Sequence, residues 1–337
     1  MRFLLFLLSA APAAAQLPRL TPAVTIGCAD CEGPEAFGAI QAIALGPGGT
    51  IVVADRDPPI LRVFGVDGRL RWAGATAGDG PGEQRLVIGV GVTADAGVVS
   101  LDMRQLRVSR YDRDRRFMTS HQLSIFPLAL GYHPTDDRVL ITAEDFRDPG
   151  GVVLWLRDGR ADTLLSPLPF AGRQGHQFAS PAVRSDGAFA MGEGRELYHV
   201  SLRARDGTLL RTLVRDIPRT RRTPDELAAA ERRMMRAGAR RSAEGGSGAG
   251  PMVDPWRSHF TALDALAFDD QDRLWVRTER GGPGRSVFDL FSREGVFLGE
   301  IPLDAEVDHY RVSGGFLAGV IVTEDGTQRV RIWRLDP

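Results

Sequence analysis

Acidic and arginine side chains recur together where short apolar runs end, and this is the strongest chemical signal in the chain. Five such groups occur: Asp55 and Asp57, Asp102 with Arg104, Asp145 with Arg147, Glu193 with Arg195, and Arg277 with Glu279. In one interpretation, each acid accepts backbone N–H groups in the following turn and pairs with its arginine. In the other, the groups form a mixed-charge rim whose guanidinium forks bind a polar ligand. Both interpretations predict a polar face, and the choice between them stays open.

No pattern in the sequence identifies a catalytic group or a metal ligand. The six histidines have no H-x-H or H-x-x-x-H spacing, although ligands on separate repeats could converge in space. Residues 78–83 (GDGPGE) look like a phosphate loop but lack the required lysine and hydroxyl residue. A G-x-S-x-G nucleophile turn is absent. We therefore predict no cofactor, and although Ca²⁺ is chemically possible, no motif supports it.

Both cysteines, Cys28 and Cys31, lie in one short stretch. In an exported chain this spacing predicts a disulfide that closes a small loop. Half of a zinc site is the alternative, but no second C-x-x-C or histidine pair completes it. A thioredoxin-like motif would need a helix after the second cysteine, and residues 32–35 (EGPE) do not start one.

The elements that position these groups form a repeat of about six units. Each unit reads as an apolar run, a Gly/Asp turn, a β-branched run that ends in an acid, and an aromatic-bearing run closed by a second turn. The first turns lie at Gly49, Gly97, Asp137, Gly187, Asp272 and Gly314. A period of about 40–50 residues with several short strands per unit is typical of propeller blades. We predict an all-β, six-bladed β-propeller of four-stranded blades.

The two ends of the chain are predicted to share the last blade. Residues 330–333 (VRIW) form a third strand with no fourth strand after it, and residues 23–26 (AVTI) form a strand with none before it. Pairing of these two strands closes the ring and removes an exposed sheet edge.

One helical insertion interrupts the pattern between blades 4 and 5, over residues of about 218–258 including a Gly/Ser-rich tether. Thr223 is the predicted N-cap, Pro224 the first helical residue, and Glu226 completes a capping box. By topology the helix could lie across the channel as a lid, with Arg236, Arg240 and Trp256 as candidate contacts. The alternative is a solvated excursion that covers a blade edge.

The first fifteen residues predict a secretory signal peptide, because Arg2 precedes an apolar run and three alanines end the segment. Residues 16–337 then form a single domain that is exported to the periplasm or beyond the cell, without membrane insertion. The net charge is −1, with 42 basic and 43 acidic residues, so no nucleic-acid partner is expected. The basic residues are all arginine, and the chain contains no asparagine.

The chain resembles NHL-repeat proteins and exported, uncharacterised bacterial six-bladed propellers. The resemblance is carried by residues 78–83 (GDGPGE), 50–55 (TIVVAD), 61–68 (LRVFGVDG), 273–277 (RLWVR) and 329–333 (RVRIW). It implies the propeller fold, and it would permit a calcium-dependent lactonase or a zinc-dependent lyase. The lactonase type uses an asparagine ligand, which this chain lacks, and no motif matches the histidines of the lyase type.

These observations favour an exported, non-enzymatic binding scaffold, monomeric, for a protein, peptide or polar small molecule. The alternative function is a metal-dependent, lactonase-like hydrolase or lyase that acts at the mouth of the central channel. A purely structural module of an envelope assembly is the third hypothesis.

Overall fold

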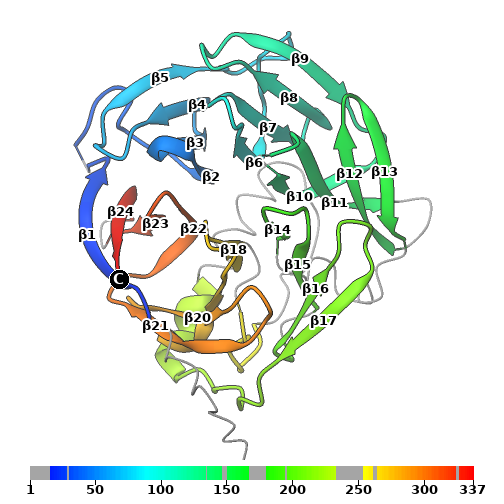
Figure 1. Ribbon diagram of the computed structural model, residues 1–337. Coiled ribbons are helices and arrows are strands. Elements are labelled where there is room, and N and C mark those ends of the chain that lie inside the picture. Colours follow the sequence, from blue (N-terminus) through cyan, green and yellow to red (C-terminus); the bar gives the residue numbers. More distant parts are fainter. Residues whose placement is uncertain are drawn as a thin grey trace, which may run out of the picture.

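The computed structural model is a ring of six four-stranded antiparallel sheets around a central channel (Figure 1). It describes residues 16–28, 30–133, 135–145, 150–166, 180–193, 196–232, 253–260, 264–323 and 326–337. Each sheet is one blade, so the predicted all-β, six-bladed propeller is confirmed. Within the described residues, no helix is long and apolar enough to span a membrane.

The first five blades each use four strands that follow one another in sequence from the channel outwards. Blade 1 contains β2 (Ile40–Gly46), β3 (Thr50–Arg56), β4 (Pro59–Phe64) and β5 (Leu70–Gly74); blade 2 contains β6 (Val87–Val92), β7 (Val98–Asp102), β8 (Arg107–Tyr111) and β9 (Phe117–Gln122). Blade 3 contains β10 (Phe126–His133), β11 (Arg138–Asp145), β12 (Gly150–Arg157) and β13 (Arg160–Leu165); blade 4 contains β14 (Ala182–Val183), β15 (Phe189–Gly192), β16 (His199–Arg203) and β17 (Leu209–Val214). Blade 5 contains β18 (Leu266–Phe268), β19 (Leu274–Thr278), β20 (Ser286–Phe291) and β21 (Phe297–Leu303), and two short 3-10 turns are η1 (Pro47–Gly49) and η2 (Glu279–Gly281).

Blade 6 closes the ring with the two ends of the chain. Its inner strands are β22 (Val307–Ser313), β23 (Phe316–Val322) and β24 (Gln328–Asp336), and its outer strand is β1 (Arg19–Ile26). Strands β1 and β24 pair antiparallel, with Val24 opposite Ile332, and lie side by side in Figure 1. The predicted ring closure is therefore confirmed.

The tight turns between the first two strands of each blade hold residues in the left-handed conformation. Five of the six markers of the first turn have a positive φ, and at the sixth the neighbouring residue Ala96 takes this conformation (φ 66°) in place of Gly97. Glycines and aspartates suit these positions because they adopt a positive φ at little steric cost.

Glycines on the inner strands allow neighbouring blades to approach closely. A Cβ atom on Gly46 would overlap the side chain of Val92 on the next blade. One on Gly91 would lie 2.7 Å from Tyr132, and one on Gly131 would lie 2.8 Å from Val183. In each case the glycine belongs to one blade and the large side chain to the blade that follows it. The inner strands therefore interlock in one direction around this part of the ring.

Apolar layers between the blades supply the core. Between blades 5 and 6, for example, Trp275, Phe288, Tyr310 and Trp333 are all buried. The rings of Phe288 and Tyr310 lie 4.9 Å apart across the junction. Burial of such large aromatic surfaces is the main source of stability expected for this packing.

The two faces of the ring carry different connections. We call the face with the first-to-second and third-to-fourth strand turns the hairpin face. The other face, with the second-to-third strand turns and the blade-to-blade connections, is the rim face. The described part of the helical insertion leaves and re-enters the ring at the rim face, before blade 5.

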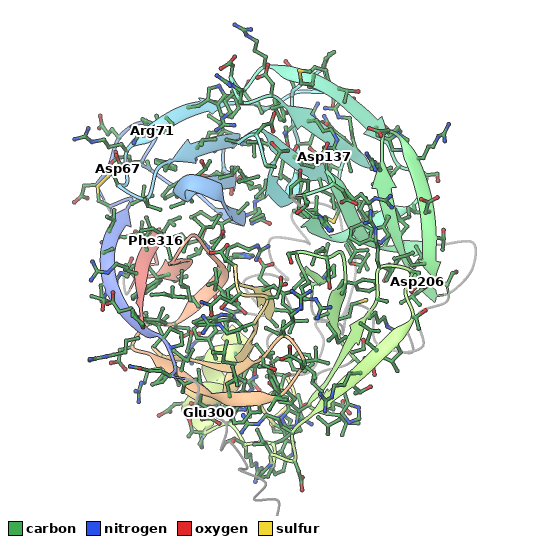
Figure 2. The ribbon with its side chains drawn as sticks, in the orientation of Figure 1. Asp67, Arg71, Asp137, Asp206, Glu300 and Phe316 are labelled. Carbon is green, nitrogen blue, oxygen red and sulfur yellow. A yellow bond between two sulfur atoms is a disulfide. The ribbon has the colours of Figure 1, made fainter. Side chains whose placement is uncertain are left out.

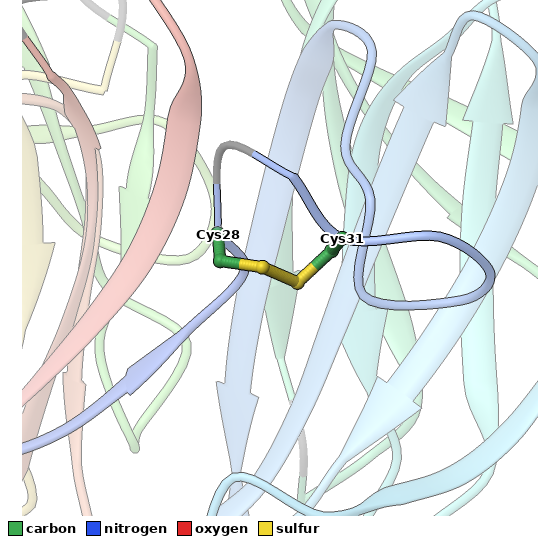
Figure 3. Close-up of a disulfide and its surroundings, with 2 residues drawn as sticks. All are labelled: Cys28 and Cys31. Carbon is green, nitrogen blue, oxygen red and sulfur yellow. A yellow bond between two sulfur atoms is a disulfide. The ribbon is translucent and has the colours of Figure 1, made fainter.

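The predicted disulfide joins Cys28 to Cys31 directly after β1 (Figure 3). Residues beyond it lead into blade 1, where Phe37 packs on Phe64 with ring centroids 6.0 Å apart. The bridge therefore fixes the chain between the closing strand and the first blade.

Candidate functional site

The central channel contains a cavity of about 250 Å³. Its wall comes from the inner strands of all six blades and is mostly aliphatic and aromatic. Residues that line it include Val90, Leu130, Tyr132, Phe268 and Val312. Most lining residues lie in the last halves of their strands, which places the cavity nearer the hairpin face.

Three aspartates line the hairpin-face end of the cavity, in the turn between β18 and β19. Asp269 accepts hydrogen bonds from its own turn and from the indole Nε1 of Trp275 at 3.0 Å. Asp272 accepts the Ser185 hydroxyl at 2.7 Å, and Asp270 accepts the Ser313 hydroxyl at 2.9 Å. Asp272 and Asp270 thus connect blade 5 to its two neighbours.

One basic side chain, Arg311 on β22, lines the same cavity. Its Nη2 atom lies 2.8 Å from Oδ1 of Asp264, and its Nη1 donates to the carbonyl of Tyr310 at 2.7 Å. The second oxygen of Asp264 lies 2.5 Å from Nδ1 of His309. These three side chains come from blades 5 and 6 and meet at the rim end of the channel.

Asp264 remains ionised in this cluster. Burial would raise the pKa of its carboxyl, but the charge of Arg311 and the hydrogen bonds from His309 and Arg311 hold it well below the usual range. Arg277 is buried close by, and desolvation lowers the pKa of its guanidinium against the attraction of Asp308, Tyr310, Asp264 and Glu279. The guanidinium still carries its charge at neutral pH.

Two of the predicted rim acids have structural partners. Asp55 is buried and accepts the backbone N–H groups of Gly38 and Ala39, and Arg62 donates to it at 2.7 Å. Asp102 is buried and accepts the backbone N–H groups of three residues, Arg85, Leu86 and Gln105. In both blades the acid ties the start of the inner strand to the end of the second strand.

The other predicted rim residues differ in exposure. Asp57 is 60% exposed beside Arg56, and Arg104 is exposed. Glu193 lies 3.7 Å from Arg203 of its own blade, and Glu279 accepts a hydrogen bond from Arg222 of the insertion at 2.9 Å. The side chain of Asp145, and the residues Arg147 and Arg195, lie outside the described part of the structure. The structure thus scatters these groups around the ring instead of gathering them, and ligand binding by them stays a prediction.

The insertion begins as the sequence predicts. The Thr223 hydroxyl accepts the backbone N–H of Glu226, and the Glu226 carboxylate accepts that of Thr223, which completes the capping box of a helix described over residues 224–232. The two arms of the insertion pair at Arg221 and Trp256.

Contacts to blade 5 hold the described part of the insertion in place. Arg222 and Arg257 both donate to Glu279, one to its carboxylate and the other to its carbonyl at 3.1 Å. In Figure 1 the helix overlaps blade 5 and not the channel. The lid candidates Arg236 and Arg240 lie outside the described residues, and Trp256 is 44% exposed on the returning arm.

A divalent-metal centre has no match among the described side chains. No three or more of their His, Cys, Asp and Glu groups converge to hold an ion. The described residues therefore do not fit a calcium or zinc site of the kind that some propellers carry.

The sequence pattern did not single out Asp264, His309 and Arg311. Asp264 stands just before an inner strand, and His309 and Arg311 stand two residues apart on the next inner strand. Polar residues on strands that border the channel would have been the signal, but it becomes visible only when the inner strands are known.

Comparison with solved structures supports the fold. The chain is similar to a catalytically inactive virginiamycin B lyase from Staphylococcus aureus with quinupristin (11% identity, 93% of this chain and 99% of that chain, TM-score 0.52). It is similar to a gluconolactonase from Xanthomonas campestris (14% identity, 95% and 100% covered, TM-score 0.52). It is also similar to a Bacteroides fragilis protein whose export is inferred (11% identity, 97% and 98% covered, TM-score 0.57).

At these identities the likeness establishes the propeller architecture alone. No protein-family profile and no curated protein sequence matches the chain. The chain is thus a six-bladed β-propeller of the kind found in bacterial proteins, a fold that does not by itself determine function.

Proposed function

We propose that this protein is an exported propeller that binds a small molecule in its central channel without transforming it. The observation that carries this proposal is the preformed cavity of about 250 Å³, which is apolar on most of its wall and polar at a few points. Ligand sites in proteins are usually concave, apolar and preformed, with few polar groups that set orientation. Drug-sized ligands fill about 300–1,000 Å³, so a smaller ligand is expected here.

Export is supported by the first fifteen residues of the sequence and by the disulfide. Disulfides persist in the periplasm and outside the cell, where the environment is oxidising. The periplasm or the cell exterior is therefore the proposed location.

Ligand-observed NMR with a fragment library tests channel binding in the mature chain. Val90 lines the cavity and also packs in the apolar layer between blades 1 and 2, so Val90→Phe should narrow the cavity and abolish binding in a protein that a thermal melt shows to be folded. Val322→Phe is the matched control, because it makes the same change at a half-exposed surface position. Fragments that bind the control but not Val90→Phe support the proposal. If no fragment in the library loses binding in Val90→Phe, the proposal is contradicted.

The role of the insertion is tested by the same measurement. Removal of residues 226–252, with the two arms joined by a short Gly/Ser link, keeps the pairing of Arg221 with Trp256. If the insertion acts as a lid, the deletion should change the rates of ligand entry and exit. Unchanged rates and affinities would show that the insertion only covers blade 5.

A hydrolase or lyase at the channel mouth is the second candidate, and one observation favours it. The buried carboxylate of Asp264 contacts Nδ1 of His309, an arrangement that can orient a histidine as a general base. Elemental analysis by mass spectrometry of chelator-free protein, followed by assays on lactones and esters, tests this candidate. About one tightly held Ca²⁺ or Zn²⁺ per chain together with turnover would favour the enzyme over the binding scaffold.

A further inference from the structure

In the channel wall, hydrogen-bond donors and acceptors differ in how many protein partners they already have. Arg311 is the only basic residue that lines the cavity in the described part of the chain. A guanidinium carries five N–H groups. Described residues account for two of those of Arg311, through Asp264 and the carbonyl of Tyr310. Within the described residues, three N–H groups of Arg311 remain as unused donors at this one point of the wall.

The acids of the wall, in contrast to Arg311, already have several hydrogen-bond partners in the protein. Asp269 accepts two backbone N–H groups, the indole of Trp275 and the guanidinium of Arg273 at 2.7 Å. Asp272 accepts the backbone and hydroxyl of Ser185 and a donor from Arg293. Asp270 accepts the Ser313 hydroxyl and a backbone N–H. Each of these acids thus accepts at least two hydrogen bonds from the protein, whereas Arg311 keeps unused donors, so a ligand with acceptor groups is matched at Arg311.

We propose that the channel ligand is a small carboxylate whose oxygens accept hydrogen bonds from Arg311. This inference rests on the proposed channel binding and names the chemical class of the ligand. The apolar part of the ligand packs against Val90, Leu130 and Phe268 of the wall. Guanidinium and carboxylate match in geometry, and their charge-assisted hydrogen bonds are stronger than neutral ones.

The charge of the cluster selects a monoanion over a dianion. Asp264 already neutralises much of the charge of Arg311, from 2.8 Å away. A phosphate or sulfate dianion would place excess negative charge in an apolar cavity, and burial of unpaired charge is costly. A singly charged carboxylate with a short aromatic or branched aliphatic body brings half of that charge and incurs less of this cost.

Titration calorimetry on the mature protein tests the ligand class with three compounds of one shape: benzoate, benzamide and benzylamine. The wild-type protein should bind benzoate at least about 10-fold more tightly than benzamide, because hydrogen bonds to a charged group contribute more than neutral ones. Benzylamine should bind least. This comparison needs no variant, so it stands even where a substitution disturbs folding.

Arg311→Gln should remove the preference for benzoate, with a loss of about 10- to 100-fold in its affinity and little change for benzamide. Arg311→Lys keeps the charge without the fork and should give an intermediate loss. Arg69→Gln is the control, since that arginine is 81% exposed on blade 1. Thermal melts confirm that each variant is folded.

The outcomes separate this inference from the function on which it rests. Equal or tighter binding of benzamide or benzylamine, sensitive to Val90→Phe, overturns the carboxylate while the channel remains a binding site. A carboxylate preference that survives Arg311→Gln also overturns it. If no compound in the series or the fragment library depends on the cavity, the proposed function itself fails.

Discussion

Polar side chains do different work on the two faces of the ring. On the hairpin face they join neighbouring blades, as Arg110 joins Asp137 at 2.5 Å and Asp272 joins Ser185 at 2.7 Å. Figure 2 labels Asp137 on blade 3, where it receives this contact. In the described residues, such bridges span the junctions from blade 2 through blade 6. On the rim face, Asp55 and Asp102 tie strands within a single blade.

The difference shows which bonds fix one blade to the next and which stay within a single blade. Cross-blade bonds on the hairpin face fix the spacing of the blades, so the channel wall near that face is held in place. The rim-face bonds of Asp55 and Asp102 stabilise blades 1 and 2 without fixing a neighbour, whereas Asp264 joins blade 5 to Arg311 and His309 of blade 6 at the rim end of the channel. The helical insertion leaves the ring on the rim face, just after Arg215, which joins the end of blade 4 to Asp289 and Glu300 of blade 5.

The largest expected effect comes from loss of a rim acid that is internal to its blade. Asp55→Ala should lower the free energy of unfolding by about 3–5 kcal/mol, because it leaves the buried Arg62 without its partner. Urea unfolding measures this loss. Asp57→Ala is the control, and since that carboxylate is 60% exposed, a change within about 0.5 kcal/mol is expected. Equal effects at the two positions would contradict the assignment of Asp55 to a structural role.

A hairpin-face acid should have a smaller effect that extends over two blades. Asp272→Ala removes the acceptor of Ser185 and Arg293 and should cost about 2–3 kcal/mol. Hydrogen exchange should then rise in both blade 4 and blade 5, whereas Asp55→Ala should raise it in blade 1 alone. Asp304→Ala is the control at an 87% exposed position. Exchange that rises in blade 5 only would show that the hairpin-face bridges do not couple blades.

Loss of the disulfide should have a smaller effect again. Cys28 and Cys31 are three positions apart, so the bridge closes a very short loop and constrains the unfolded chain little. Cys28→Ser with Cys31→Ser should lower the unfolding free energy by about 1–2 kcal/mol. Urea unfolding with and without reductant measures it. A loss as large as that of Asp55→Ala would mean that the bridge organises ring closure as well.

Acidification should produce the smallest effect, through one histidine on each face. Burial lowers the pKa of His133 on the hairpin face, with Arg205 adding to the shift, and burial likewise lowers that of His259 near the rim. The unfolded chain therefore binds protons first, and stability falls as pH drops below about 6.5 towards the folded-state pKa.

Stability measured from pH 8 to pH 5 tests this sign. His133→Gln and His259→Gln should each flatten part of the decline. A wild-type protein that gains stability over the same interval would contradict the sign that burial gives to both histidines.

The sequence predicts what local periodicity encodes. Repeated turns led to the blades, a strand without a partner at each end led to the closure of β24 by β1, and Thr223 and Glu226 led to the helix start. Partners that are distant in sequence could not be predicted this way. Ser185 and Asp272 are 87 residues apart, and Asp264 and His309 are 45 apart. Only the angular arrangement of the blades brings such residues together.

The inner-strand glycines of blades 1 to 3 make the packing between blades directional around the ring. Gly46, Gly91 and Gly131 each receive a side chain from the following blade, never from the preceding one. The unit that could be exchanged between such propellers is therefore not a blade. The unit is the junction between two blades, which consists of a glycine and the side chain of the next blade that packs on it. A transplanted blade would need a glycine that fits the blade after it. It would also need a side chain, equivalent to Val92 or Tyr132, that fits the glycine of the blade before it.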